Sequence, residues 1–206
     1  MTKPKLTYFD MHASRGEECR LALHCAGVEF EDNRITRDTW MTLKASSPFG
    51  GLPLFEIPGK PVLAQSNAVL VYIGREYGLH PKDNFEAARH EGLLAHAESL
   101  REEVGRTLRM PDAEKKTVRE QLAASYIPTW ATYTERALTG DGPFVGGDKL
   151  NIVDIKLHII VRWLARGTVD HIPATIFDAY PRLLRLSAAV AEHPGVKSWR
   201  ARTNQQ

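Results

Sequence analysis

The first third of the chain alternates short apolar runs with one helical stripe. Residues 5–9 (KLTYF) and 28–35 (VEFEDNRI) contain the β-branched and aromatic side chains that favour strands. Between them, residues 15–26 place apolar side chains at positions 21, 22, 25 and 26, which is a helical spacing. Gly27 follows as a helix stop. This pattern predicts a β-α-β unit.

Two short apolar runs come next, at residues 54–57 and 62–64, and prolines surround them. The spacer between them, residues 58–61 (PGKP), is too short for a parallel crossover, so the two strands should pair as a hairpin. Residues 68–77 have a helical pattern that ends at Gly78. The predicted order of the first third is therefore β-α-β followed by β-β-α.

From about residue 81 the pattern changes to long helical segments, and strand signals nearly vanish. The turn-like sequence GLHPKDN at 78–84 marks a domain boundary. We predict an α/β domain over 1–80 and an all-α domain over 85–206. In the second domain, Asn151 and Asp154 have the spacing of a capping box, to which we give a structural role only. The helices are expected at 85–108, 112–138, 151–166 and 181–193.

Composition narrows the class of protein. The chain has 206 residues, of which 43% are hydrophobic, and a net charge of +2. This charge gives no reason to expect nucleic acid or an anionic membrane as a partner. No apolar run approaches the ~20 residues that span a bilayer, and the N-terminus lacks the apolar segment of a secretory signal.

Cys19 and Cys25 would lie on different faces of one helix, which indicates reduced thiols and a cytoplasmic location. The eight histidines show no ligand spacing, so no metal is expected.

Four motifs, taken in order, resemble the cytosolic glutathione transferases over nearly the whole chain. KLTYFDM followed by Arg15, and AGVEFED at 26–32, look like the start of a tyrosine-type enzyme, closest to the sigma class with alpha-like features. PFGGLP at 48–53 and QSNAVLVYI at 65–73 look like its middle. The resemblance implies an α/β thioredoxin-like N-terminal domain that binds glutathione, plus an all-α C-terminal domain. The second domain would form the hydrophobic substrate site and part of a homodimer interface.

The resemblance also implies where glutathione is held. Pro53 would follow a cis bond, so that the backbone of Leu52 pairs with the cysteinyl backbone of glutathione as an added strand would. Gln65 and Ser66 would begin the next helix, where free N–H groups and the helix dipole favour the γ-glutamyl carboxylate. The alternative is that Ser66 is a plain N-cap and Gln65 a polar residue at a strand end.

The chemistry that the resemblance implies centres on Tyr8. A thiol of pKa ~8.5 is mostly protonated at neutral pH, so the enzyme must favour the thiolate. A hydroxyl that donates a hydrogen bond to sulfur does this, because it stabilises the charged form. The alternative is an ordinary packed tyrosine in a strand. Since neighbouring strand residues point to opposite faces, we expect Phe9 to pack inward while Tyr8 faces the cleft.

Arg15 is implied as an electrostatic support for the thiolate. The loop 10–14 before it is one residue longer than the family pattern, which makes Ser14 a rival hydroxyl donor. Ser14 could instead cap the first helix, with Glu17 completing a capping box. Cys19 is a weaker rival, and we expect it to pack as a small hydrophobic residue.

Further contacts to glutathione are implied at its two ends. The indole N–H of Trp40 and the ammonium of Lys44 suit the glycyl carboxylate; the alternative is an apolar anchor and a solvated lysine. Across the dimer, an acidic residue would meet the γ-glutamyl ammonium. The matching position is Glu102, and Glu98 and Glu103 lie near it in register.

The second substrate would be a small hydrophobic electrophile. Its wall is assigned to five residues that could equally belong to the core, Met11, His12, Val104, Arg106 and Met110. The sequence therefore predicts a glutathione transferase that conjugates such an electrophile, with peroxidase or isomerase activity as related possibilities. The alternative is a non-catalytic transferase-like binding or regulatory module, in which the tyrosine or the glutathione anchors are often lost.

Overall fold

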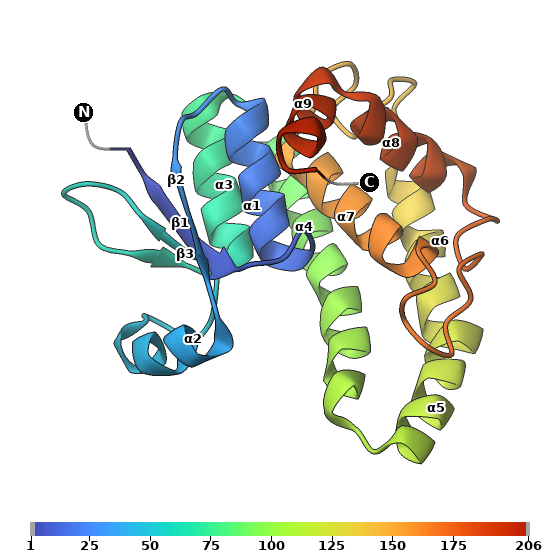
Figure 1. The fold of residues 1–206 in the computed structure, drawn as a ribbon. Coiled ribbons are helices and arrows are strands. Elements are labelled where there is room, and N and C mark those ends of the chain that lie inside the picture. The colour runs from blue at the N-terminus through green and yellow to red at the C-terminus, as the bar shows by residue number, and fades with distance from the viewer. Residues whose placement is uncertain (1–2, 205–206) are drawn as a thin grey trace. The chain divides into compact units, whose positions relative to one another are not determined.

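The computed structural model describes residues 3–204, which form two compact units (Figure 1). The first unit contains the described residues up to Lys82 and those from Glu192 onward, and the second contains Asp83–Ala191. The last described segment of the chain, from Glu192 onward, thus belongs to the first unit.

A mixed four-stranded sheet lies at the centre of the first unit. Its strand order is β2-β1-β3-β4, with β1 parallel to β2 and antiparallel to β3. The antiparallel pair β3–β4 confirms the predicted hairpin. The strand β2 starts later than predicted, because the Val28 N–H still donates to the Leu23 carbonyl at the preceding helix end (2.9 Å). The strands are β1 (Lys5–Phe9), β2 (Glu31–Ile35), β3 (Leu54–Glu56) and β4 (Leu63–Ala64).

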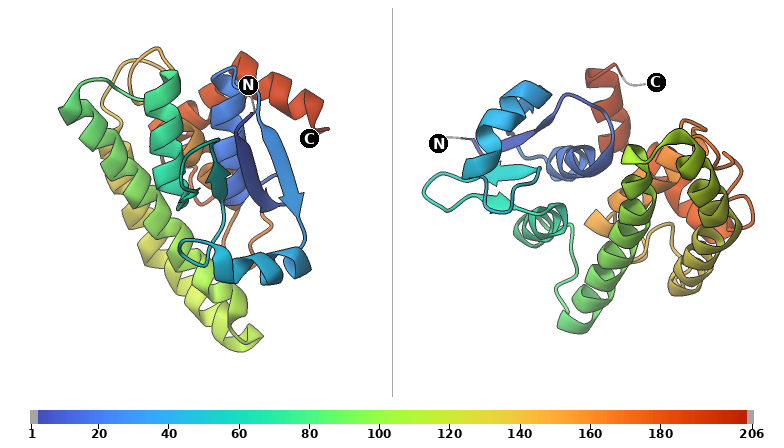
Figure 2. Two further views of the ribbon diagram at one scale, coloured as in Figure 1. Left: turned by 90° about the vertical axis from the view of Figure 1, so that its left-hand side faces the viewer. Right: turned by 90° about the horizontal axis from the view of Figure 1, so that it is seen from below.

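Helices α1 (Ser14–Cys25) and α3 (Ser66–Tyr77) lie side by side against this sheet (Figures 1 and 2). The α3 stripe at positions 69, 70 and 73 is fully buried, as an amphipathic helix requires. Gly78 ends α3 with a φ of +80°, a conformation that glycine adopts without strain.

Two further helices complete the first unit. Helix α2 (Arg37–Leu43), continued by a 3-10 turn at Lys44–Ser46, has no buried residue. Helix α9 (Pro194–Arg202) packs on α1. The sequence pattern did not predict α9, whose apolar residues are few.

The second unit is helical throughout its named elements, and this confirms the predicted fold class. The predicted helix 112–138 is divided by a π-helical turn at Leu122–Tyr126, which ends two residues before Pro128. Proline has no N–H for the α-helical hydrogen bond, so the regular ladder is interrupted there. The α-helices are α4 (Asn84–Gly105), α5 (Asp112–Gln121), α6 (Ile127–Ala137), α7 (Ile152–Ala165) and α8 (Pro181–Glu192), with a 3-10 turn at Arg106–Arg109.

The start of α7 contains the predicted capping box. The Asn151 N–H donates to Asp154 Oδ2 at 2.8 Å, and the Val145 N–H donates to Asp154 Oδ1 at 2.8 Å. Both bonds lie within the second unit, which agrees with a structural role. Among residues 3–204, no helix is long and apolar enough to cross a membrane.

Candidate functional site

The ring of Tyr8 is packed against the first turn of α1. Tyr8 is only 5% exposed. A Cβ added to Gly16 would lie 2.1 Å from Tyr8 Cδ1, so the ring occupies space that only glycine leaves open. The guanidinium carbon of Arg20 lies 5.9 Å from the ring centroid. The ring is therefore fixed in place, whereas its hydroxyl makes no hydrogen bond with any described residue.

The expectation that Phe9 packs inward is wrong. Tyr8 is the buried ring and Phe9 is half-buried, with the two centroids 5.6 Å apart in an edge-to-face arrangement. Burial does not alternate along β1, since Leu6, Thr7 and Tyr8 are all buried, and the helix α1 packs on the ring of Tyr8.

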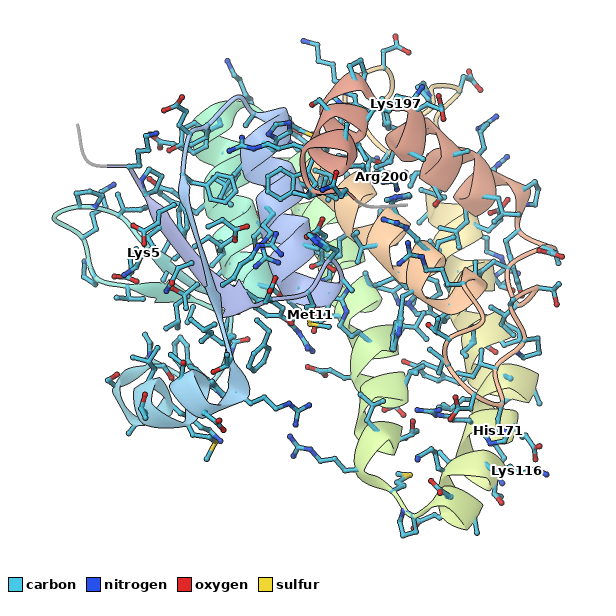
Figure 3. All side chains as sticks on the ribbon, in the orientation of Figure 1. Lys5, Met11, Lys116, His171, Lys197 and Arg200 are labelled. Atoms are coloured by element: carbon cyan, nitrogen blue, oxygen red, sulfur yellow. The ribbon has the colours of Figure 1, made fainter. Side chains whose placement is uncertain are left out.

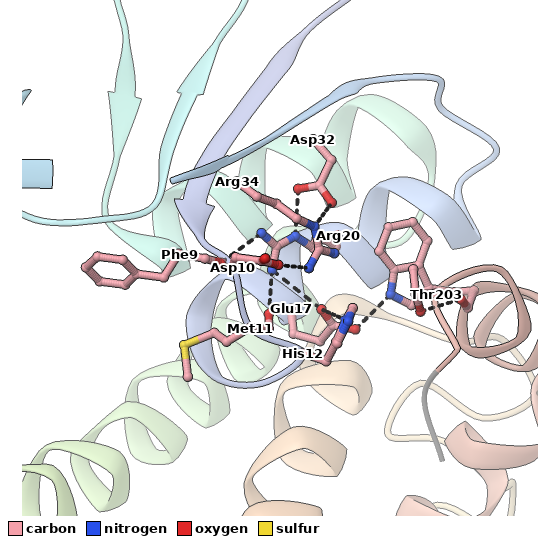
Figure 4. A network of polar contacts seen from close by, with 10 residues as sticks. Phe9, Asp10, Met11, His12, Glu17, Arg20, Asp32, Arg34 and Thr203 are labelled. Atoms are coloured by element: carbon pink, nitrogen blue, oxygen red, sulfur yellow. Dashed lines mark hydrogen bonds and ion pairs between the residues drawn. The ribbon is translucent and has the colours of Figure 1, made fainter. Parts of the chain in front are cut away.

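Arg20 organises the loop that follows Tyr8 (Figure 4). This arginine is fully buried. Its Nη2 donates to the Phe9 carbonyl at 3.1 Å and its Nη1 to the Met11 carbonyl at 2.8 Å. Its Nε donates to Asp32 Oδ1 at 2.7 Å. One side chain thus ties β2 to both ends of the turn that leaves β1.

Arg34 extends this network to the surface. It donates through Nε to Asp32 Oδ2 at 2.8 Å and through Nη1 to Asp10 Oδ1 at 2.9 Å. The hydrogen bond from Arg34 holds the pKa of the Asp10 carboxyl below its usual value.

Ser14 is the first residue of α1, with a φ of +62°. The N-cap is Ala13, and no side chain caps the helix, so the interpretation of Ser14 as the N-cap is wrong. The Glu17 carboxylate does not close a capping box either, and its Oε1 accepts a hydrogen bond from the Trp199 indole. Arg15 is half-buried in the first turn. Cys19 is fully buried, as expected of a small core residue.

The peptide bond between Leu52 and Pro53 is cis, as predicted. Leu52 is half-buried, and neither its N–H nor its carbonyl bonds to the backbone of residues 3–204. Backbone groups that have no partner within the chain can pair with an additional strand.

The junction between β4 and α3 has an unusual backbone. Gln65 is the N-cap, with φ +71° and ψ 116°, and its side chain is exposed. A non-glycine residue with positive φ costs ~1–3 kcal/mol and persists where the surroundings fix it, often at functional sites. Ser66 is the buried first residue of α3, so its interpretation as the N-cap is wrong. Neither side chain bonds to another described residue.

Trp40 and Lys44 are one turn apart, as predicted, and the Lys44 N–H donates to the Trp40 carbonyl. Trp40 is half-buried and Lys44 is exposed. The Lys44 side chain extends toward Gly50, where an added Cβ would lie 3.8 Å from Lys44 Cε. Within the described chain, the indole N–H and the ammonium have no partner.

The three acidic candidates of α4 differ in their surroundings. Glu98 forms an ion pair with Lys156, and Glu103 forms one with Arg106. Glu102 is exposed and forms no ion pair with residues of the described range.

The five residues assigned to the electrophile site are distributed over both units. In the first unit, Met11, which Figure 3 labels, follows the strand β1. Its exposed fraction is 41%, and His12 is half-buried. In the second, Arg106 is exposed and Met110 is half-buried. Val104 is 0% exposed, as a core residue would be. The wall that they would form stays a prediction.

Sequence reasoning missed Gly16 and Arg20. The spacing of Glu17 and Arg20, one helical turn apart, is a signal for an ion pair that could have been used. Nothing local indicates that the ring of Tyr8 needs a glycine across from it.

Two family models match the chain. They are described as "Glutathione S-transferase, N-terminal domain", over residues 4–75, and "Glutathione S-transferase, C-terminal domain", over residues 98–203. The chain belongs to the glutathione S-transferase family. This membership supports glutathione transferase function, with glutathione as the co-substrate, and does not favour a non-catalytic module.

Similar proteins match the chain over almost its full length. Glutathione S-transferase 1 of Ascaris suum is 32% identical, with 97% of this chain and 96% of that one covered. S-crystallin 4 of Enteroctopus dofleini is 27% identical, with 94% of each covered. The crystal structure of the Ascaris lumbricoides glutathione S-transferase is 32% identical, with a TM-score of 0.84 and 97% of each chain covered. The structure of prostaglandin synthase D of Nilaparvata lugens is 29% identical, with the same TM-score and coverage.

Proposed function

We propose that the chain is a tyrosine-type glutathione transferase, closest to the sigma class, in which the hydroxyl of Tyr8 stabilises the glutathione thiolate. The observation that carries the proposal is a set of polar groups in the first unit that have no partner among the described residues. They are the side-chain donors of Tyr8, Trp40, Lys44, Gln65 and Ser66 and the backbone of Leu52.

These groups match the parts of a γ-glutamyl-cysteinyl-glycine peptide. The Leu52 backbone pairs with the cysteinyl backbone, next to Pro53. Gln65 and Ser66, at the start of α3, hold the γ-glutamyl carboxylate with the help of the helix N-terminus. The Trp40 indole and the Lys44 ammonium hold the glycyl carboxylate.

The reaction begins when the thiol of glutathione releases its proton to water. The Tyr8 hydroxyl donates a hydrogen bond to the sulfur anion, and each unit by which the thiol pKa falls corresponds to ~1.4 kcal/mol. Arg15 adds positive charge beside the sulfur. The thiolate's electron pair then forms a carbon–sulfur bond with the electrophile, and the leaving group departs with its own bonding pair. The rival donor of this hydrogen bond is Ser14, the first residue of α1, which directly precedes Arg15.

We assign glutathione binding to domain 1–80, and the hydrophobic substrate site with part of a homodimer interface to domain 85–206. Glu102 of the partner subunit meets the γ-glutamyl ammonium, which agrees with the absence of an ion pair at Glu102 within the described residues. Within domain 85–206, the electrophile contacts the residues around Met110. The enzyme works in the cytoplasm, without a metal, a nucleic acid or a membrane as partner.

Titration with glutathione tests the proposal most directly. Glutathione at millimolar concentration should raise the melting temperature by mass action, and the Ser66→Ala variant should show a smaller rise at the same concentration. Absence of any rise in the wild-type protein would refute the proposed site.

A further inference from the structure

The last helix of the chain is hydrogen-bonded to the first. The Trp199 Nε1–H on α9 donates to Glu17 Oε1 on α1 at 2.7 Å, across 182 positions of sequence. Both side chains are buried, with exposures of 3% and 1%. Both residues also lie in the first compact unit, so this contact belongs to the internal structure of that unit.

Glu17 lies between this indole and the buried guanidinium of Arg20. Glu17 Oε2 is 3.6 Å from Arg20 Nη1 and 4.0 Å from His12 Nδ1 (Figure 4). A buried arginine needs compensating carboxylates, and Arg20 has two in Glu17 and Asp32. The indole N–H fixes one Glu17 oxygen, and this leaves the other oxygen facing Arg20.

Arg20 in turn holds the backbone on the C-terminal side of Tyr8. Its two terminal nitrogens donate to the carbonyls of Phe9 and Met11. Charge-assisted hydrogen bonds of this kind are short and directional. A turn of the guanidinium would therefore move the strand end that carries Tyr8 and the loop that leads to Ser14.

We propose that Trp199 is a positioning residue for the thiol end of the glutathione site, acting through Glu17 and Arg20. The inference rests on the proposed function. It gives the last helix a role in the reaction although no atom of that helix needs to contact the substrate.

The test compares Trp199→Phe with Ser198→Ala. The first variant keeps an aromatic ring and removes the N–H. The second removes a different hydrogen bond between these helices, in which Ser198 Oγ lies 2.8 Å from His24 Nε2. His24 is at the opposite end of α1 from the loop. Both variants weaken the docking of α9, but only the first acts on Glu17.

Two readouts are measured. The first is hydrogen exchange of the Met11 amide, which donates to the Phe9 carbonyl at 2.9 Å and reports on the loop without any substrate. The second is the pH profile of kcat/KM for glutathione. Trp199→Phe should speed exchange at Met11, raise the apparent thiol pKa by about 0.5–1 unit, and lower kcat/KM at neutral pH by about threefold to tenfold. Ser198→Ala should change neither readout.

Equal effects of the two variants would overturn the proposal, because they would show only that α9 must dock. Unchanged exchange at Met11 in Trp199→Phe would overturn it as well. If exchange responds as expected but the wild-type protein binds no glutathione, the proposed function fails, and the mechanical link from Trp199 to the loop stands.

Discussion

Replacement of Gly16 by alanine tests whether the position of the Tyr8 ring controls the chemistry. The new Cβ would lie 2.1 Å from Tyr8 Cδ1 and 2.2 Å from Cγ. Ordinary contact begins near 3.4 Å, so the ring must move by about 1.3 Å, the difference between 3.4 and 2.1 Å. A displacement of ~1 Å at a reacting group can cost ~100-fold in rate. We expect kcat to fall by about that factor, with a loss of stability of about 1–3 kcal/mol from overpacking.

The assay is steady-state conjugation of glutathione to an aromatic halide, combined with thermal unfolding and glutathione titration. The glutathione Kd should stay close to that of the wild type, because the proposed carboxylate anchors lie on other elements. Gly92→Ala is the matched control: it is also a helical glycine, but no atom lies within 4 Å of its added Cβ. This control should be as active as the wild type and slightly more stable.

A Gly16→Ala variant with wild-type kcat would refute the reasoning. It would mean either that the ring moves without consequence or that Tyr8 is not the donor to sulfur. Loss of glutathione affinity in parallel with kcat would also count against it, since the change would then have disturbed the whole unit.

Three other expectations can be measured with the same assays. Tyr8→Phe should lower kcat about tenfold or more, whereas Ser14→Ala should stay near wild type; the reverse result would give the role to Ser14. Lys44→Ala should weaken glutathione binding about twofold to fivefold in a salt-dependent way, as for an exposed ion pair, and Lys60→Ala, on the turn before β4, should not. Burial raises the pKa of Asp154 to about 7, despite two backbone hydrogen bonds that lower it. The folded state therefore holds this proton at a pH where the unfolded state has lost it, so the free energy of unfolding should fall from about pH 4 to pH 7, and Asp154→Asn should remove that slope.

Much of the first unit was predictable because its signals are local. The strand β1 has the predicted bounds, and a four-residue spacer was enough to identify the hairpin. Two of the proposed glutathione anchors, Gln65 and Ser66, lie at the start of α3, where the residue types themselves indicate a site. The Leu52–Pro53 junction is another local signal of this kind.

The errors have physical causes that a local pattern does not contain. Gln65 and Ser14 both have positive φ, which shifts the cap position by one residue relative to the expected side chain. Whether Tyr8 or Phe9 is the buried ring of β1 depends on which face of the strand α1 covers. Strand alternation alone does not decide that. The helix α9 has few apolar residues and is stabilised through tertiary contacts with α1.

Residues proposed to contact the ligand can therefore be predicted from the sequence more easily than the residues that hold them in position. The proposed binding groups, such as Lys44, have no partner among the described residues, and an internal partner would compete with the ligand. Each of them can be recognised from its own surroundings. The residues that hold these groups in position are buried, and they must be paired because an unpaired buried charge is costly. Their partners come from distant segments: Glu17 depends on Trp199, and Tyr8 on the missing side chain of Gly16. A sequence pattern can thus locate the anchors of such a site, whereas the precision of the site depends on pairs that only folding brings together.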